Sequence, residues 1–219
     1  MQPNPHLEPQ PVIHGAPPRD ARLVVYAVHG RSQTPAFMTE LADRIALPEV
    51  AYLVPAAKDA TWYPGGFMEP LENNQPNLGH ALAAVGTHLE WLAAQDIERD
   101  RTVLLGFSQG ACLLSEFLMG ARARYAGAIL HTGGFIGPSE VGRSRAAGDL
   151  AGMPVLMSSA AEDAWVPMPR IKATAAALAA AGASVELQSY DEQEHHINDD
   201  SVAAMRRLLT NLMSLKESQ

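Results

Sequence analysis

Short, continuous apolar runs alternate along this chain with longer stretches in which apolar residues recur at helical spacing. A continuous apolar run is typical of a strand buried on both faces of a sheet, whereas regular alternation, as in SVELQSY at 184–190, predicts an edge strand. Continuous runs cover residues 23–30, 50–57, 102–107, 125–134 and 153–160. Helical spacing covers residues 34–48, 78–95, 109–123, 166–182 and 199–216.

This order predicts an α/β fold, with a mostly parallel, twisted sheet covered by helices on both faces. The polar, proline-rich residues 1–10 are expected to form a flexible arm, and residues 11–219 a single domain. The segment between the runs at 125–134 and 153–160 is too short for a large lid domain. In such sheets ligands bind at the carboxyl ends of the strands, so the loops that follow the strands are where chemistry is expected.

Composition narrows the classes of partner. The chain has 219 residues, 47% of them hydrophobic, and a formal net charge of −8. An acidic protein is a poor partner for nucleic acid or an anionic membrane surface. The sequence has no apolar run long enough to span a membrane and no secretory signal, and its one cysteine, Cys112, has no partner for an intrachain disulfide. These features favour a cytoplasmic protein and leave open whether it forms a homodimer.

One motif carries chemistry. Residues 106–110 read Gly-Phe-Ser-Gln-Gly, or G-x-S-x-G, between a predicted strand and a predicted helix. In that setting a sharp turn presents the serine hydroxyl above the sheet, and the glycines leave room for neighbouring backbone. Ser108 is therefore the candidate nucleophile, and Cys112, four residues further on, is expected to be a packing residue.

A serine nucleophile needs a base, and in this setting an acid and then a histidine follow the serine along the chain. His195 and His196 lie in the loop before the last helix, and either has the required position; His131, at the end of a strand, is expected to be a core or loop-lining residue. Candidate acids are Glu162 and Asp163, just after a strand. Asp149 and Asp191 are alternatives that read as turn or solvated residues.

The oxyanion of an acyl-transfer reaction needs backbone donors. The first strong strand runs into HGRSQ at 29–33, so the N–H groups of Arg31 and Gln109 are the expected donors, with His29 bracing the loop. The loop at 58–76 is rich in aromatic residues. The residues expected to line a substrate pocket are Trp62, Tyr63, Phe67, Phe107 and Trp165.

Six segments, occurring in one order, resemble the phospholipase/carboxylesterase family of α/β-hydrolases, which includes acyl-protein-thioesterase-like and dienelactone-hydrolase-like serine esterases. They are HGRSQTP, TWYPGGFMEPLENNQPNLGHAL, LLGFSQGACL, HTGGFIG, SAAEDAWVP and YDEQEHHI. The resemblance implies that Ser108 is the nucleophile, that Asp163 in a D-x-x-V-P segment is the acid, and that His195 is the base. The family usually has a glycine before that histidine, where this chain has Glu194.

The resemblance also implies a carboxylesterase that uses a small-molecule ester and neither a metal nor another cofactor. Ser108 stands where dienelactone hydrolases have a cysteine, which argues against their chemistry. A thioesterase or lysophospholipase acting on longer acyl chains is the alternative, ranked second because clustered basic residues that would bind a CoA phosphate are few. A receptor that keeps the fold without catalysis ranks third, because every member of the triad is present.

Overall fold

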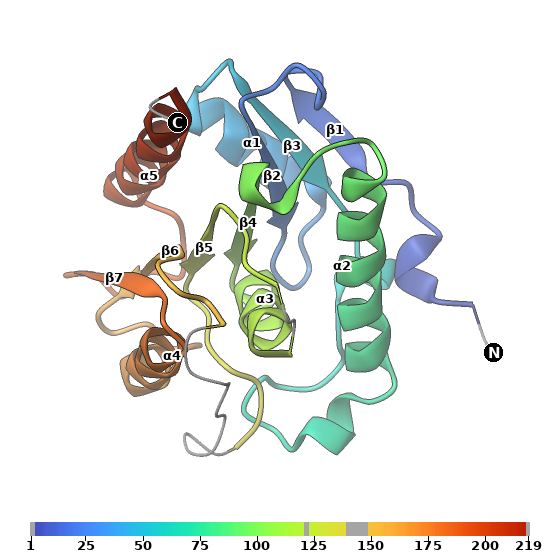
Figure 1. The fold of residues 1–219 in the computed structure, drawn as a ribbon. Coiled ribbons are helices and arrows are strands. Elements are labelled where there is room, and N and C mark those ends of the chain that lie inside the picture. The colour runs from blue at the N-terminus through green and yellow to red at the C-terminus, as the bar shows by residue number, and fades with distance from the viewer. Residues whose placement is uncertain (1–2, 121–122, 139–148, 218–219) are drawn as a thin grey trace.

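The continuous apolar runs form the centre of a seven-stranded sheet in a computed structural model of the protein (Figure 1). The structure describes residues 3–120, 123–138 and 149–217. The strands are β1 (Val12–Gly15), β2 (Leu23–Val28), β3 (Val50–Val54), β4 (Thr102–Phe107), β5 (Gly127–His131), β6 (Pro154–Ala160) and β7 (Ser184–Tyr190). Their order across the sheet is β1-β3-β2-β4-β5-β6-β7, and only β1 runs antiparallel to its neighbour. The predicted mostly parallel sheet is confirmed.

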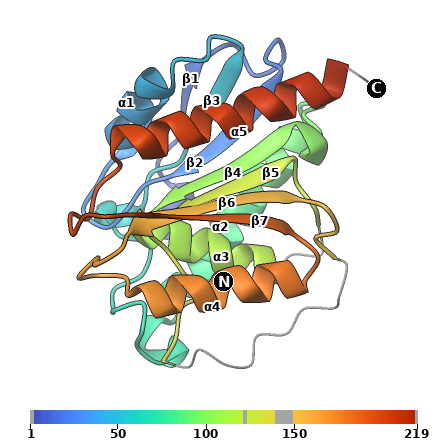
Figure 2. The same ribbon diagram turned by 90° about the vertical axis from the view of Figure 1, so that its left-hand side faces the viewer.

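Helices cover both faces of the sheet, as Figure 2 shows. They are α1 (Pro35–Ile45), α2 (Asn77–Ala93), α3 (Gln109–Gly120), α4 (Met168–Ala180) and α5 (Asp199–Glu217). Helices α1 and α5 lie on one face, and α2, α3 and α4 lie on the other. The predicted helix at 166–182 begins later, at Met168, because Pro167 occupies the N-cap position in an extended conformation.

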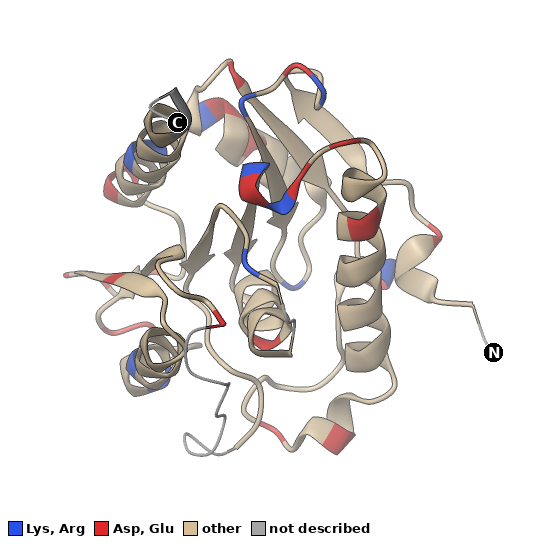
Figure 3. Ribbon diagram, in the orientation of Figure 1, with Lys and Arg blue, Asp and Glu red and all other residues tan. Residues whose placement is uncertain are grey.

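Strand β2 shows why the central runs are apolar at every position. Val24 and Tyr26 belong to the core on the α2, α3 and α4 side, whereas Leu23 and Val25 belong to the core under α1 and α5. Successive side chains of a strand point to opposite faces, so a strand covered on both sides has no solvent-facing position. The central strands β2–β6 accordingly contain no Asp, Glu, Lys or Arg, and these residues lie on helices, turns, loops and the edge strand β7 (Figure 3).

The sequence predicts one edge strand of the sheet and not the other. Strand β7 forms one edge, as its alternation predicts, and half-buried positions recur along it. Strand β1 forms the other edge and was not expected, because its four residues are too few to show a periodicity. Residues before β1, expected as an arm, contact the domain: Asn4 donates to the carbonyl of His80, and His6 is buried.

Residues 139–148, in the segment expected to be too short for a lid, lie outside the described residues, as do residues 121–122 at the end of the predicted helix at 109–123. Among the described residues, no helix combines the length and the apolar character needed to cross a membrane.

Helix α3 begins so close to the sheet that two positions have no room for a side chain. A Cβ on Gly106 would lie 2.7 Å from Ala111 Cα, and a Cβ on Gly110 would lie 2.2 Å from the carbonyl oxygen of Val28. Both neighbours are backbone atoms, which cannot rotate away. The glycines of the G-x-S-x-G motif are thus required by the approach of α3 to the ends of β4 and β2.

We expect Gly110→Ala to destabilise the fold, although alanine favours a helix, because overpacking a backbone contact costs about 1–3 kcal/mol. Gly86→Ala is the matched control: Gly86 also lies in a helix, α2, and its Cβ would meet nothing within 4 Å. That variant should gain about 0.5–1 kcal/mol. Urea denaturation measures both, and a Gly110→Ala protein with the wild-type midpoint and slope would contradict the close approach.

Candidate active site

The loops after β4, β6 and β7 bring Ser108, Asp163 and His195 into one hydrogen-bonded series. His195 Nε2 lies 2.8 Å from Ser108 Oγ, and His195 Nδ1 lies 2.7 Å from Asp163 Oδ2. A carboxylate accepts only, so Nδ1 carries the proton, and in the neutral ring Nε2 accepts from the serine hydroxyl. The Asp163 side chain is fully buried, and that of His195 is 20% exposed.

Ser108 occupies a tight turn between β4 and α3. Its φ of 52° is uncommon for a residue with a Cβ, and such strain persists only where the surroundings impose it. Here the N–H of Ser108 donates to the carbonyl of His131, and its own carbonyl accepts from Cys112 N in the first turn of α3. The turn is therefore held from both sides, and it directs the hydroxyl toward His195.

The carboxylate of Asp163 is oriented by its own loop. Its Oδ1 accepts from the N–H groups of Trp165 and Val166, each at 2.8 Å, which leaves Oδ2 for His195. The other candidate acids, Glu162, Asp149 and Asp191, are exposed. The structure thus brings Asp163, and none of these three, to the histidine.

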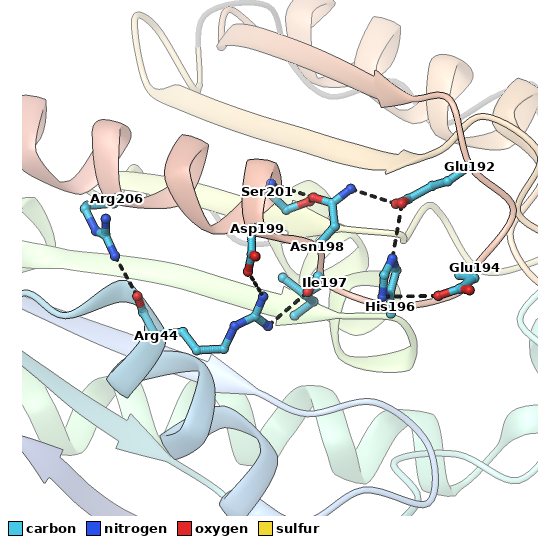
Figure 4. Close-up of polar contacts among 9 residues, drawn as sticks. All are labelled: Arg44, Glu192, Glu194, His196, Ile197, Asn198, Asp199, Ser201 and Arg206. Atoms are coloured by element: carbon cyan, nitrogen blue, oxygen red, sulfur yellow. Dashed lines mark hydrogen bonds and ion pairs between the residues drawn. The ribbon is translucent and has the colours of Figure 1, made fainter.

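The His196 side chain lies between two glutamates of its own loop, Glu192 and Glu194, as Figure 4 shows. Its Nε2 lies 3.2 Å from Glu192 Oε2, and its Nδ1 lies 3.6 Å from Glu194 Oε2. Glu194, which replaces the usual glycine of the family, is exposed, and its carboxylate takes part in this outer cluster. Of the two adjacent histidines, His195 is the one within hydrogen-bonding distance of Ser108.

The loop after β2 lies beside the serine. A Cβ on Gly30 would be 3.2 Å from Ser108 Cβ, so the backbone that leads into Arg31 passes close to the serine. Among the described residues, no hydrogen bond is formed by the backbone N–H of Arg31 or of Gln109, the first residue of α3. Both predicted donors are thus free for an oxyanion next to Ser108.

His29 braces that loop from below. It is fully buried, and its Nδ1 donates to the carbonyl of Gly30 at 2.7 Å while its Nε2 accepts from Ala57 N at 3.1 Å. Burial lowers the pKa of His29, which keeps the ring neutral and able to accept from Ala57.

A cavity of about 560 Å³ opens above the serine and the histidine. Three of the predicted pocket residues line it: Tyr63, Phe67 and Trp165, the last of them 72% exposed. Trp62 and Phe107 are not among its lining residues. The complete lining is Arg31, Ser32, Tyr63, Pro64, Gly65, Gly66, Phe67, Ser108, Gln109, Cys112, Trp165, Val166 and His195.

Trp62 and Phe107 serve as supports instead. The Trp62 indole N–H donates to the carbonyl of His29, and its ring is buried beneath the loop against His29. Phe107 points to the opposite face of β4 from the cavity, where it stacks on Phe37. Sequence position next to a functional residue could not reveal these directions.

The sequence predicts roles for Gln109 and Arg31 through their backbone N–H groups only. In the structure their side chains also hold the cavity wall. The Gln109 amide donates to the carbonyl of Tyr63 at 2.8 Å and accepts from Trp62 N at 2.9 Å. The Arg31 guanidinium donates to the carbonyls of Tyr63, Pro64 and Gly65. The loop that forms the aromatic wall is thus tied to the residues on either side of Ser108.

Cys112 lines the cavity but is not a reactive thiol. It is buried, and this burial raises its pKa to about 11, so the thiol stays protonated at neutral pH. Its Sγ accepts from Gly134 N at 3.4 Å. The described residues contain no group of three or more histidine, cysteine, aspartate or glutamate side chains placed to hold a metal ion.

A strained serine at a strand-to-helix turn, above a mostly parallel sheet and followed along the chain by an acid and a histidine, defines the class of α/β-hydrolases. Comparisons with known proteins narrow the class. The model of the phospholipase/carboxylesterase family matches residues 10–213. The chain therefore belongs to the phospholipase/carboxylesterase family, and it is a hydrolase of the esterase type.

Solved structures share the fold, and the first of them also carries the name of the family. A phospholipase/carboxylesterase from Dyadobacter fermentans DSM 18053 is 34% identical, with a TM-score of 0.82 over 91% of this chain and 96% of its own. A carboxylesterase from Mesorhizobium loti is 23% identical, with a TM-score of 0.67 over 87% and 89%. Esterase PE8 shares the fold at 18% identity, with a TM-score of 0.77 over 93% and 98%. No curated protein matches the chain.

Burial makes His131 a source of acid sensitivity, because it lowers the pKa of this ring from 6.5 to about 4. Below pH 6.5 His131 is protonated in the unfolded chain, whereas in the folded protein it stays neutral down to about pH 4. The free energy of unfolding should therefore fall as the pH is lowered from 6.5 to 4. Urea denaturation at several pH values tests this. His131→Gln, which cannot titrate, should show a shallower decline, by up to about 1.4 kcal/mol per pH unit. Equal slopes for the two proteins would contradict it.

Proposed function

We propose that the protein is a serine carboxylesterase that cleaves small or short-chain carboxylic esters through an acyl-enzyme intermediate. The observation that carries this proposal is the hydrogen-bonded series from Ser108 through His195 to Asp163, at the floor of the cavity. A serine hydroxyl is a weak nucleophile until a base takes its proton, and the series supplies that base and its orienting acid.

In the proposed reaction, Ser108 Oγ attacks the ester carbonyl while His195 Nε2 takes the hydroxyl proton. Asp163 stabilises the imidazolium and holds its tautomer. As the tetrahedral intermediate collapses, the C–O bond to the alcohol breaks and His195 returns the proton to the leaving oxygen. Water then attacks the acyl-serine with His195 again as base, which releases the acid and restores Ser108.

The developing oxyanion is placed between the N–H groups of Arg31 and Gln109. Both donors belong to backbone that is already fixed, by His29 on one side and by the turn at Ser108 on the other. Preorganised donors of this kind are each worth about two to three orders of magnitude in rate.

The cavity favours a small acyl or alcohol group. Its aromatic wall, formed by Tyr63, Phe67 and Trp165, supplies apolar contact, and the exposed Trp165 leaves the site open to solvent. Its volume of about 560 Å³ is ordinary for a small-molecule site, and because the site is open, the far end of a long acyl chain would remain in water.

We expect a fluorophosphonate probe to label wild-type protein at Ser108 and to fail with Ser108→Ala and His195→Ala, because both the nucleophile and its base are required. Asp163→Asn should lower kcat by about four orders of magnitude through loss of the correct histidine tautomer. Peptide mapping locates the label. His196→Ala is the matched control and should label normally; loss of labelling there, with His195→Ala still reactive, would reverse the assignment of the base.

For nitrophenyl esters from butyrate to palmitate, we expect turnover to fall steadily with acyl length, because the open site leaves the added methylene groups of longer chains in water. Steady-state kinetics below the micelle concentration of each ester measures this. A maximum at long chains would contradict the short-chain preference and favour the thioesterase or lysophospholipase alternative.

A further inference from the structure

His131 is a buried histidine that the proposed reaction leaves without a role. It ends β5, is 1% exposed, and lies directly beneath the loop that carries His195. Its Nε2 lies 2.8 Å from the carbonyl oxygen of His196, and its Nδ1 lies 2.7 Å from Ser158 Oγ on β6. Each ring nitrogen therefore has one specific polar partner.

These partners fix the state of the ring. A carbonyl only accepts, so Nε2 carries the proton; burial keeps the ring neutral by lowering its pKa, so Nδ1 accepts from the Ser158 hydroxyl. The neutral ring thus acts as a fixed donor to the peptide between His196 and Ile197, one residue beyond the base. A charged ring would donate from Nδ1 as well, so the Ser158 hydroxyl would have to accept instead, and among the described residues no anion lies within hydrogen-bonding distance of the ring to compensate the charge.

The backbone of the same residue holds the nucleophile. The carbonyl of His131 accepts from the N–H of Ser108 at 3.0 Å. His131 is therefore connected on one side to the strained turn of the nucleophile and on the other side to the loop of the base. These two contacts hold the two segments whose side chains meet at the 2.8 Å distance between Ser108 Oγ and His195 Nε2.

The outer part of the base loop is held by other contacts, which Figure 4 shows. Arg44 on α1 donates to the carbonyl of Ile197, and Asn198 donates to Glu192. These contacts lie on the solvent side, and the His131 hydrogen bond reaches the loop from the sheet. The Phe107 ring contacts both histidine rings, with its centroid 5.8 Å from that of His131 and 5.2 Å from that of His195.

We propose that His131 is a positioning residue of the hydrolase, which sets the separation of Ser108 and His195 by donating to the carbonyl of His196. The proposal rests on the proposed role of His195 as the base. It predicts that the N–H donor at this position matters more than the aromatic ring, because it is the donor of His131, and not its ring face, that binds the carbonyl of His196.

The test compares variants that separate the donor from the ring. His131→Phe keeps a planar ring against Phe107 and removes the donor, whereas His131→Gln places an amide N–H near the position of Nε2. His131→Asn is the matched control for His131→Gln, since it carries the same amide group on a side chain that is too short to reach the carbonyl of His196. The readouts are the second-order rate of fluorophosphonate inactivation, corrected for the folded fraction, and hydrogen exchange of the amides at 192–198.

We expect His131→Phe and His131→Asn to inactivate about ten- to a hundredfold more slowly than wild type, since small misplacements of catalytic groups cost factors of this size. His131→Gln should regain most of the rate. Exchange at 192–198 should speed up in the first two variants and stay near wild type in the third, with β4 unchanged in all of them.

Two results would overturn the proposal: a wild-type rate in His131→Phe, or a glutamine variant as slow as the phenylalanine variant. A wild-type protein that the probe does not label would instead refute the proposed function. The exchange measurement needs no catalysis, so it decides separately whether His131 holds the loop.

Discussion

The close approach of α3 to the ends of β4 and β2 is the constraint on which the rest of the site depends. Gly106 and Gly110 leave no space for a Cβ, and the backbone of Ser108 takes a positive φ to make the turn. The strain is retained because the hydrogen bonds of Ser108 with His131 and Cys112 hold the turn on both sides. One steric requirement thus places the serine, the start of α3 and the neighbouring loop after β2 together.

Neutral, buried histidines stabilise this arrangement. His29 and His131 each connect a loop to the body of the protein through both ring nitrogens, and burial lowers the pKa of each ring. A buried charge would need a compensating partner, whereas a neutral imidazole needs only one donor and one acceptor. The imidazole is therefore well suited to join two backbone segments at a fixed tautomer.

The sequence predicts much of this from chain order and strand ends. Ser108 stands in a motif with a defined setting, and Asp163 and His195 follow later strands, where parallel topology gathers them at one edge. Side-chain direction is harder to predict. Phe107 precedes the serine but points to the opposite face of β4, and Trp62 lies in an irregular loop, where no periodicity indicates its direction. The positioning proposed for His131 depends on a contact 65 residues away, which no local pattern reveals.

The two proposed oxyanion donors also link catalysis to the substrate wall. Arg31 and Gln109 are the proposed backbone donors, and their side chains bind the carbonyls of residues 63–65 and the N–H of Trp62. A shift of the aromatic wall would therefore move the two residues that are proposed to bind the oxyanion. In such a site the fit of the substrate and the stabilisation of the transition state are not independent, since both are transmitted through the same two residues. Selection for a new ester would then act on kcat as well as on KM.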